Sequence, residues 1–271
     1  MIYDRIQLDD KDENAYLEVF APDANENFKR KAILIIPGGG YGMVCSNREG
    51  EPIAQAFIPY GYCAFVLHYS VAKEGVYFPV HLIQASKAMK HIKDNAQRYN
   101  IDAHKVYACG FSAGGHLAGS LGILWDNEEI YKIVDMPKGY NKPAGIMLIY
   151  PVVSPEHHDM SFKRLLGDNI NSQKHRDMVS LEKHVSSSSS PAFIMHTSND
   201  QVVNVKNSLL LAEAYGNADM IYEMHIYPDA PHGAALGNEI TCGNNPKHND
   251  KSIAKWVQQA VEWADKIEGD V

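Results

Sequence analysis

Short runs of β-branched and aromatic residues recur along this chain, and several of them are apolar at every position. A strand with one solvated face alternates apolar and polar residues, whereas a strand covered by helices on both faces of a parallel sheet is apolar throughout. The sequence therefore predicts a sheet that is buried on both sides. The runs are residues 16–20, 32–36, 63–69, 105–109, 144–150, 192–196 and 221–226.

Helical patterns separate many of these runs. One covers residues 80–99, and the last, over residues 253–267, has the spacing of an amphipathic helix that rests on a core. This alternation predicts an α/β fold, with a doubly wound, mostly parallel sheet and helices on both faces. We expect a single domain over residues 1–271, in which residues 155–184 form a small cap over the edge of the sheet because they are polar and lack a strand pattern.

Length and composition exclude several classes of protein. A chain of 271 residues that is 45% hydrophobic can bury a sizeable core without disulfides. Its net charge of −8 and the lack of a Lys/Arg cluster argue against nucleic acid or anionic membranes as partners. Its longest apolar runs reach about five residues, against the ~20 needed to cross a bilayer. The charged first twenty residues do not resemble a signal peptide, so we expect a soluble, cytoplasmic protein.

Neither the cysteines nor the adjacent histidines predict a metal site. Cys45, Cys63, Cys109 and Cys242 share no C-x-x-C spacing, and free, buried thiols are expected. The pair at 157–158, followed by an aspartate, has no further ligand spaced to complete a site, so we expect two solvated histidines and no metal.

The segment Gly110-Phe111-Ser112-Ala113-Gly114 follows a strand pattern and precedes a helical one. In that context G-x-S-x-G forms a sharp turn that presents the serine hydroxyl, and the small residues let strand and helix approach closely. The N–H of Ala113 and the positive end of the helix lie where an oxyanion would form. We predict that Ser112 is a nucleophile.

A second glycine-rich segment, residues 37–41, follows an earlier strand pattern. It does not fit G-x-G-x-x-G with a later acidic residue, so nucleotide binding is disfavoured. Glycine lets the backbone face a ligand, and we predict that Gly39 and Gly40 complete an oxyanion hole with Ala113. Tyr41 is the expected substrate-binding side chain.

A serine hydroxyl needs a base and an orienting carboxylate. After a turn of this kind these groups follow in the order acid and then histidine, each on a loop after a later strand. The chain has 13 histidines, and His232 is the one in a small, turn-rich segment between a late strand and the final helix. We assign His232 as base and Asp200, after the run at 192–196, as acid. Asp229 remains the alternative acid, and His116 is expected to pack inside its helix.

Together, residues 37–41, 110–116, Asp200 and His232 resemble the α/β-hydrolase superfamily. More narrowly, they are similar to its esterase and lipase branch, related to hormone-sensitive lipase and to bacterial acetylesterases, including acetyl-xylan-type enzymes. The resemblance begins near residue 32 and is more specific for the superfamily than for a substrate. Pro37 stands where many relatives have histidine, but the oxyanion donors are backbone groups, so we expect the hole to persist.

The resemblance implies a serine carboxylesterase in which Ser112, His232 and Asp200 form the catalytic triad and no cofactor or metal takes part. Its partner would be a small-molecule ester with a short acyl group, such as acetyl, on a sugar among other alcohols; the segment 46–52 also resembles sugar-ester hydrolases. The alternatives are a formamidase or peptidase of the same fold, or a non-catalytic ligand-binding member, which the presence of His232 disfavours. A homodimer is expected only from the general frequency of dimers.

Overall fold

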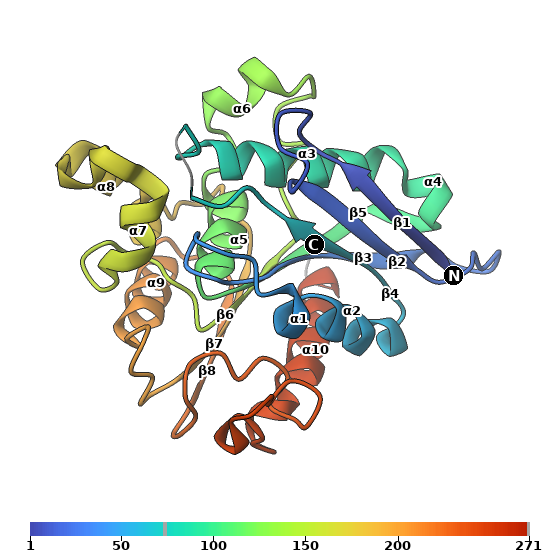
Figure 1. Ribbon diagram of the computed structural model, residues 1–271. Coiled ribbons are helices and arrows are strands. Elements are labelled where there is room, and N and C mark those ends of the chain that lie inside the picture. The colour runs from blue at the N-terminus through green and yellow to red at the C-terminus, as the bar shows by residue number, and fades with distance from the viewer. Residues whose placement is uncertain (73–74, 270–271) are drawn as a thin grey trace.

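The computed structural model describes residues 1–72 and 75–269, and its centre is one eight-stranded sheet in the order β1-β2-β4-β3-β5-β6-β7-β8. The pairs β1/β2 and β2/β4 are antiparallel, and the remaining neighbours are parallel. Helices cover both faces (Figure 1), which confirms the predicted fold class. The strands are β1 (Ile2–Gln7), β2 (Tyr16–Ala21), β3 (Arg30–Ile36), β4 (Tyr62–His68), β5 (Ile101–Phe111), β6 (Ile146–Ile149), β7 (Ala192–Thr197) and β8 (Tyr222–Tyr227).

The helices follow the strands in the alternation expected of such a sheet. They are α1 (Ser46–Glu49), α2 (Glu51–Phe57), α3 (Val80–Asp94), α4 (Ala96–Tyr99), α5 (Ala113–Ile123), α6 (Glu128–Ile133), α7 (Asp159–Leu166), α8 (Gln173–Val179), α9 (Lys206–Asn217) and α10 (Trp256–Gly269). The helix predicted over residues 80–99 is interrupted at Asn95, which caps both α3 and α4.

Two apolar clusters, one on each face, hold the sheet between its helices. Along β3, Ala32, Leu34 and Ile36 belong to the cluster under α3, α5 and α9. Ile33 and Ile35 belong to the cluster under α2 and α10. Burying one such side chain contributes about 1.5–3 kcal/mol, so both faces of a central strand select apolar residues. This explains why the central runs are apolar throughout.

The strand β1 was not predicted. It pairs with β2 at the edge of the sheet, and its residues alternate between half-buried and exposed. Charged residues such as Asp4 and Arg5 are usual on an edge strand, where they oppose pairing with other chains. In the sequence they resemble a polar terminal segment.

The segment 155–184, predicted to form a small cap over the sheet's edge, contains α7, α8 and short 3-10 turns. The carbonyl of Leu165 accepts a hydrogen bond from the N–H of Phe78, and the carbonyl of Val179 accepts one from His116 on α5. In Figure 1, α7 and α8 lie on the side of α5 and α9, away from β1. Apolar side chains of the segment, such as Phe162, join the cluster under α5.

The cysteine prediction is correct only in part. All four are free, and Cys63 and Cys109 on central strands are buried, but Cys45 and Cys242 lie on loops and are half-buried.

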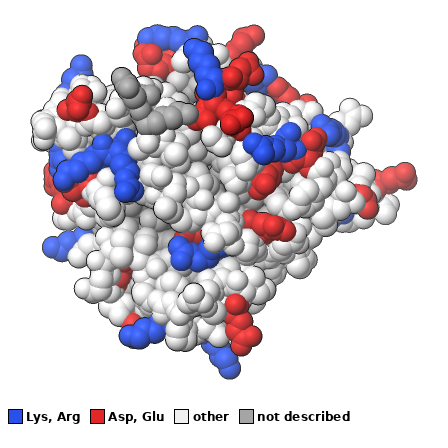
Figure 2. All heavy atoms as spheres, viewed as in Figure 1, with Lys and Arg blue, Asp and Glu red and all other residues white. Residues whose placement is uncertain are grey.

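Figure 2 shows acidic and basic side chains close together around one face, with a largely uncharged centre. Within residues 1–72 and 75–269, the helices lack the length and apolar character that a bilayer crossing requires.

His116 is a fully buried imidazole beside the apolar cluster under α3, α5 and α9. Its Nδ1 lies 2.7 Å from the hydroxyl of Tyr41, and its Nε2 donates to the carbonyl of Val179 at 2.8 Å. Burial lowers the pKa of His116 to about 4. The side chain is therefore neutral in the folded protein at pH values where an unfolded chain would protonate it.

This buried histidine should make the fold sensitive to acid. The unfolded state takes up more protons between the unfolded pKa of about 6.5 and the folded value of about 4, so the free energy of unfolding falls as pH is lowered through that window. We expect His116→Gln to reduce the fall by up to about 3 kcal/mol, as measured by urea denaturation at several pH values. The exposed His104→Gln is the control; equal slopes for His116→Gln and wild type would contradict the prediction.

Candidate active site

Ser112 occupies a strained turn between β5 and α5. Its φ of 53° and ψ of −119° lie outside the regions that most side chains adopt, at a cost of about 1–3 kcal/mol. The surroundings hold this conformation, because the N–H of Ser112 donates to the carbonyl of Ile149 at 3.0 Å and its carbonyl accepts from the N–H of Val152 at 3.0 Å. The side chain remains 8% exposed at the carboxyl end of β5.

Gly110 and Gly114 permit the close packing around this turn. A Cβ added to Gly110 would lie 2.1 Å from the carbonyl oxygen of Gly114. A Cβ added to Gly114 would lie 2.1 Å from the carbonyl oxygen of Ile36 and 2.3 Å from that of Pro37. Only glycine fits at either position, so the turn that carries Ser112 packs backbone against backbone on the end of β3.

The structure brings Ser112, His232 and Asp200 together from the loops after β5, β8 and β7. His232 Nε2 lies 2.9 Å from Ser112 Oγ, and His232 Nδ1 lies 2.6 Å from Asp200 Oδ2. An ionised carboxylate can only accept, so Nδ1 donates to Asp200 and Nε2 is the ring nitrogen that faces the serine hydroxyl. Asp229, the alternative acid, accepts instead from the side chain of Asn199.

Asp200 is held by several donors. Its Oδ1 accepts from the N–H groups of Val202 at 2.8 Å and Val203 at 2.9 Å, and His196 Nε2 lies 3.4 Å from its Oδ2. Burial alone would raise the pKa of Asp200, but the hydrogen bonds from His196 and His232 outweigh burial and hold it well below its ordinary value. The carboxylate therefore stays ionised beside the imidazole.

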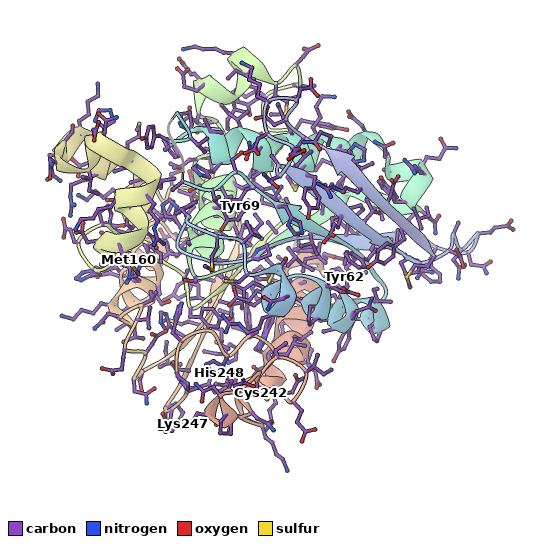
Figure 3. The ribbon with its side chains drawn as sticks, viewed as in Figure 1. Tyr62, Tyr69, Met160, Cys242, Lys247 and His248 are labelled. Atoms are coloured by element: carbon purple, nitrogen blue, oxygen red, sulfur yellow. The ribbon has the colours of Figure 1, made fainter. Side chains whose placement is uncertain are left out.

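His232 is fixed by contacts that the sequence does not reveal. Its ring packs edge-on against Tyr150, with centroids 4.9 Å apart. His248 Nε2 donates to the carbonyl of His232 at 3.1 Å. Figure 3 shows His248 beside Cys242 at the bottom of the view, on the long connection between β8 and α10.

The loop after β3 brings Gly39 and Gly40 to the wall of a cavity over Ser112. Gly39 has a φ of +131°, and a Cβ there would lie 2.1 Å from the carbonyl oxygen of Met43. Within the described chain, the N–H groups of Gly39 and Gly40 donate to no protein acceptor. The hydroxyl of Tyr69, near the centre of Figure 3, supports this loop by donating to the carbonyl of Pro37 at 2.9 Å. Ala113 is the first residue of α5, where N–H groups lack partners inside the helix.

A cavity of about 260 Å³ lies over Ser112. It is lined by Ser112, His232, the glycine loop and side chains from α1, α7 and the loop after β7. The lining residues are Gly39, Gly40, Met43, Cys45, Arg48, Glu49, Ser112, His158, Met160, Ser161, Arg164, Val202 and His232. Met160 lies at the left of Figure 3, on α7. Among the described residues, no cluster of three or more His, Cys, Asp or Glu is placed to hold a metal ion.

Two sequence-based expectations differ from this geometry. Tyr41 does not line the cavity, because its side chain is 1% exposed and its hydroxyl pairs with His116. His158 is not a solvated side chain, because its ring nitrogens lie 3.2 Å from the carbonyl of Val202 and 2.9 Å from the hydroxyl of Ser161. Arg48, Arg164 and His158 line the cavity, but no sequence pattern predicts this, since contacts between distant loops bring them together.

A hydroxyl paired with an imidazole and a carboxylate, beside unpaired backbone N–H groups, is the arrangement that transfers acyl groups. Combined with a mostly parallel sheet and a strand–serine–helix turn, it defines the class: the chain is an α/β hydrolase. Within that class the sequence matches the BD-FAE family over residues 17–215, and the chain belongs to this family. The resemblance to the esterase branch of the α/β hydrolases is thereby confirmed.

The sequence relatives are carbohydrate-related enzymes and esterases. The chain is 37% identical to the protein named endo-1,4-beta-xylanase B of Butyrivibrio fibrisolvens over 230 residues, which are 82% of this chain and 35% of that one. It is 28% identical to an acetylxylan esterase of Xylanibacter ruminicola, over 83% of this chain and 45% of the relative. The chain thus spans less than half the length of these relatives.

Solved structures match along almost the whole chain. An acetyl ester-xyloside bifunctional hydrolase from Caldicellulosiruptor lactoaceticus superposes with a TM-score of 0.83 at 30% identity, covering 98% of this chain and 96% of that one. MGS-M1, an alpha/beta hydrolase from a Medee basin deep-sea metagenome library, superposes with a TM-score of 0.80 at 30% identity and covers 98% of both chains.

The backbone contact at Gly114 predicts a large effect of one methyl group. Gly114→Ala should lower the free energy of unfolding by about 3 kcal/mol, because the added carbon meets two carbonyl oxygens that cannot move apart independently. Gly216→Ala in α9 is the matched control. The new carbon there is at least 3.7 Å from its neighbours, and stability should rise by about 0.5–1 kcal/mol. Similar changes in urea denaturation for both variants would contradict this account.

Proposed function

We propose that this protein is a serine carboxylesterase that hydrolyses short acyl esters, acetyl esters foremost, on sugars or similar polyhydroxylated alcohols. The observation that carries the proposal is the hydrogen-bonded chain from Ser112 Oγ through His232 to Asp200, with links of 2.9 and 2.6 Å. The cavity above Ser112 gives an ester access to this chain.

In the first step, Ser112 Oγ attacks the ester carbonyl while His232 Nε2 takes the hydroxyl proton. The carbonyl oxygen becomes an oxyanion, which the N–H groups of Gly39, Gly40 and Ala113 stabilise. The bond to the alcohol oxygen breaks, the imidazolium donates its proton to that oxygen, and the acyl group remains on Ser112.

In the second step, a water molecule gives a proton to His232 and attacks the acyl-enzyme by the same geometry. The new oxyanion collapses, the bond to Ser112 Oγ breaks, and the serine regains its proton. Asp200 holds His232 in the required tautomer and stabilises the imidazolium in both steps. The products are the carboxylic acid and the free alcohol.

The size of the cavity supports a short acyl group. Its volume of about 260 Å³ is below the ~300–1,000 Å³ typical of sites for drug-sized ligands. The α7 side chains Met160 and Arg164 form part of its wall, and Arg164 donates to the carbonyl of Gly40 at 3.2 Å. A long acyl chain would have to extend over these side chains into solvent.

A larger hollow adjoins the cavity, and the amides among its lining residues support a hydrophilic alcohol. It measures about 620 Å³ and shares Met43, Cys45 and Arg48 with the cavity over Ser112. Its other lining residues include the amides of Asn47 and Asn244, groups that donate and accept hydrogen bonds as sugar hydroxyls do. The names of the acetylxylan esterase and acetyl ester-xyloside hydrolase relatives agree with such an alcohol.

The decisive variant is Ser112→Ala. It should lower kcat on p-nitrophenyl acetate by about 10³-fold or more, because no other group can form the acyl-enzyme, while circular dichroism and Tm show a folded protein. Intact mass after a fluorophosphonate probe should show one adduct on wild type and none on the variant. Ser120→Ala, which removes a buried hydroxyl from α5, the helix that follows Ser112, should keep wild-type rates. Ester turnover by Ser112→Ala at normal rates would refute the proposal.

The acyl and leaving groups provide a separate test. We expect kcat/KM to fall at least about tenfold from acetyl to octanoyl p-nitrophenyl esters, because the cavity accommodates few carbons. Met160→Ala should reduce the acetyl-to-octanoyl ratio of kcat/KM, because removing this side chain widens the cavity. Acetylated xylosides should exceed formylkynurenine and aminoacyl anilides as substrates. Preference for an amide or formamide would favour the formamidase or peptidase alternative instead.

A further inference from the structure

Glu49 is a buried acidic side chain to which the mechanism above gives no role. It ends the short helix α1, and only 2% of its surface is exposed. A carboxyl group in such a place loses its hydration, which is costly unless polar partners replace the water. Glu49 also lines the cavity that contains Ser112 and His232. Its partners therefore indicate what it does there.

One oxygen of Glu49 holds the glycine loop. The N–H of Gly38 donates to Glu49 Oε2 at 2.8 Å, while the carbonyl of Gly38 accepts from the N–H of Cys45 at 3.0 Å. The N–H of Glu49 in turn donates to the carbonyl of Cys45 at 2.9 Å. Gly38 is thus fixed on both sides, directly before the two glycines that line the cavity.

The same contact reaches the nucleophile turn. A Cβ placed on Gly38 would lie 2.8 Å from Glu49 Oε2, 2.8 Å from the carbonyl oxygen of Phe111 and 3.0 Å from the Cβ of Ser112. Glu49, Gly38 and Ser112 therefore pack together with no space for a side chain. A shift of the carboxyl group would move the glycine loop relative to the serine.

The other oxygen of Glu49 leads to the histidine loop. The hydroxyl of Tyr150 donates to Glu49 Oε1 at 3.0 Å and accepts from the N–H of Ala235 at 3.1 Å. Burial and the nearby Glu49 raise the pKa of Tyr150 well above its ordinary value, so the hydroxyl keeps the proton that it donates. The ring of Tyr150 packs on His232. Arg48, at 3.4 Å from Oε1, is a weaker and partly exposed partner.

We propose that Glu49 is a positioning residue that couples the glycine loop to the histidine loop through Tyr150 and so aligns the oxyanion donors with the Ser112–His232 pair. This inference rests on the proposed esterase function. Glu49 and Tyr150 do not touch the reacting atoms; they determine where Gly39, Gly40 and His232 stand relative to Ser112.

The test compares Glu49→Gln, Tyr150→Phe and the double variant. Glutamine keeps the volume of the side chain, but its amide has one oxygen acceptor where the carboxylate has two. Phenylalanine keeps the ring on His232 but removes the link to Ala235. Because small displacements of a catalytic group are costly, each single variant should lower kcat on p-nitrophenyl acetate about tenfold, with KM changed less than about twofold. The rate of labelling by a fluorophosphonate probe, which needs only the serine, its base and the oxyanion donors, should fall in parallel.

The double variant should be little worse than the poorer single variant, because the two side chains act in one chain of hydrogen bonds. Tyr107→Phe is the matched control: its hydroxyl donates to Glu268 Oε1 at 2.6 Å, between β5 and α10, and its loss should lower Tm without changing kcat. If Glu49→Gln does not fold, Tyr150→Phe alone decides the question by the same measurements.

Three results would overturn the inference. The first is wild-type kcat and labelling rates in Tyr150→Phe and in any folded Glu49→Gln, with Ser112→Ala inactive, which would leave the esterase proposal standing. The second is a loss of activity that only tracks the unfolded fraction, and the third is fully multiplicative effects in the double variant. Wild-type protein that neither hydrolyses esters nor reacts with the probe would overturn both proposals.

Discussion

The contact between the β5–α5 turn and the end of β3 is the constraint on which the rest of the site depends. Gly110 and Gly114 bring main chain against main chain, and the packed turn leaves Ser112 only a conformation with positive φ. The strain is balanced by hydrogen bonds to Ile149, at the end of β6, and to Val152 just beyond it. In the proposed mechanism a rigid turn matters, because a nucleophile must keep its position while the acyl group is transferred.

Around this turn, the parallel sheet gathers residues that are distant in sequence. The loops after β3, β5, β7 and β8 all leave the sheet at its carboxyl edge, so Gly39, Ser112, Asp200 and His232 meet there. The fold thus supplies proximity, and hydrogen bonds within the loops supply orientation. Asp200 illustrates this division, since two N–H groups of its own loop hold the oxygen that His232 does not use.

Much of the fold could be predicted because burial on both faces leaves a direct mark on composition. The positions of Asp200 and His232 were also predictable, since each follows a recognisable strand. What the sequence could not reveal are contacts made between loops. Tyr41 was expected in the cavity but turns inward to His116, and His158 was expected in solvent but lines the cavity. The position of His158 depends on where α7 packs, and no local pattern encodes that position.

The attachment of α7 has a consequence for how substrates enter. Its last turn is tied to the segment before α3 through Leu165, and Arg164 reaches across to Gly40. Because the wall is anchored at these points, it keeps the width of the cavity entrance constant instead of opening and closing. In the proposed esterase, selectivity among acyl groups would then be set by the fixed dimensions of the cavity entrance. Exchanging α7 is the direct way to change that selectivity.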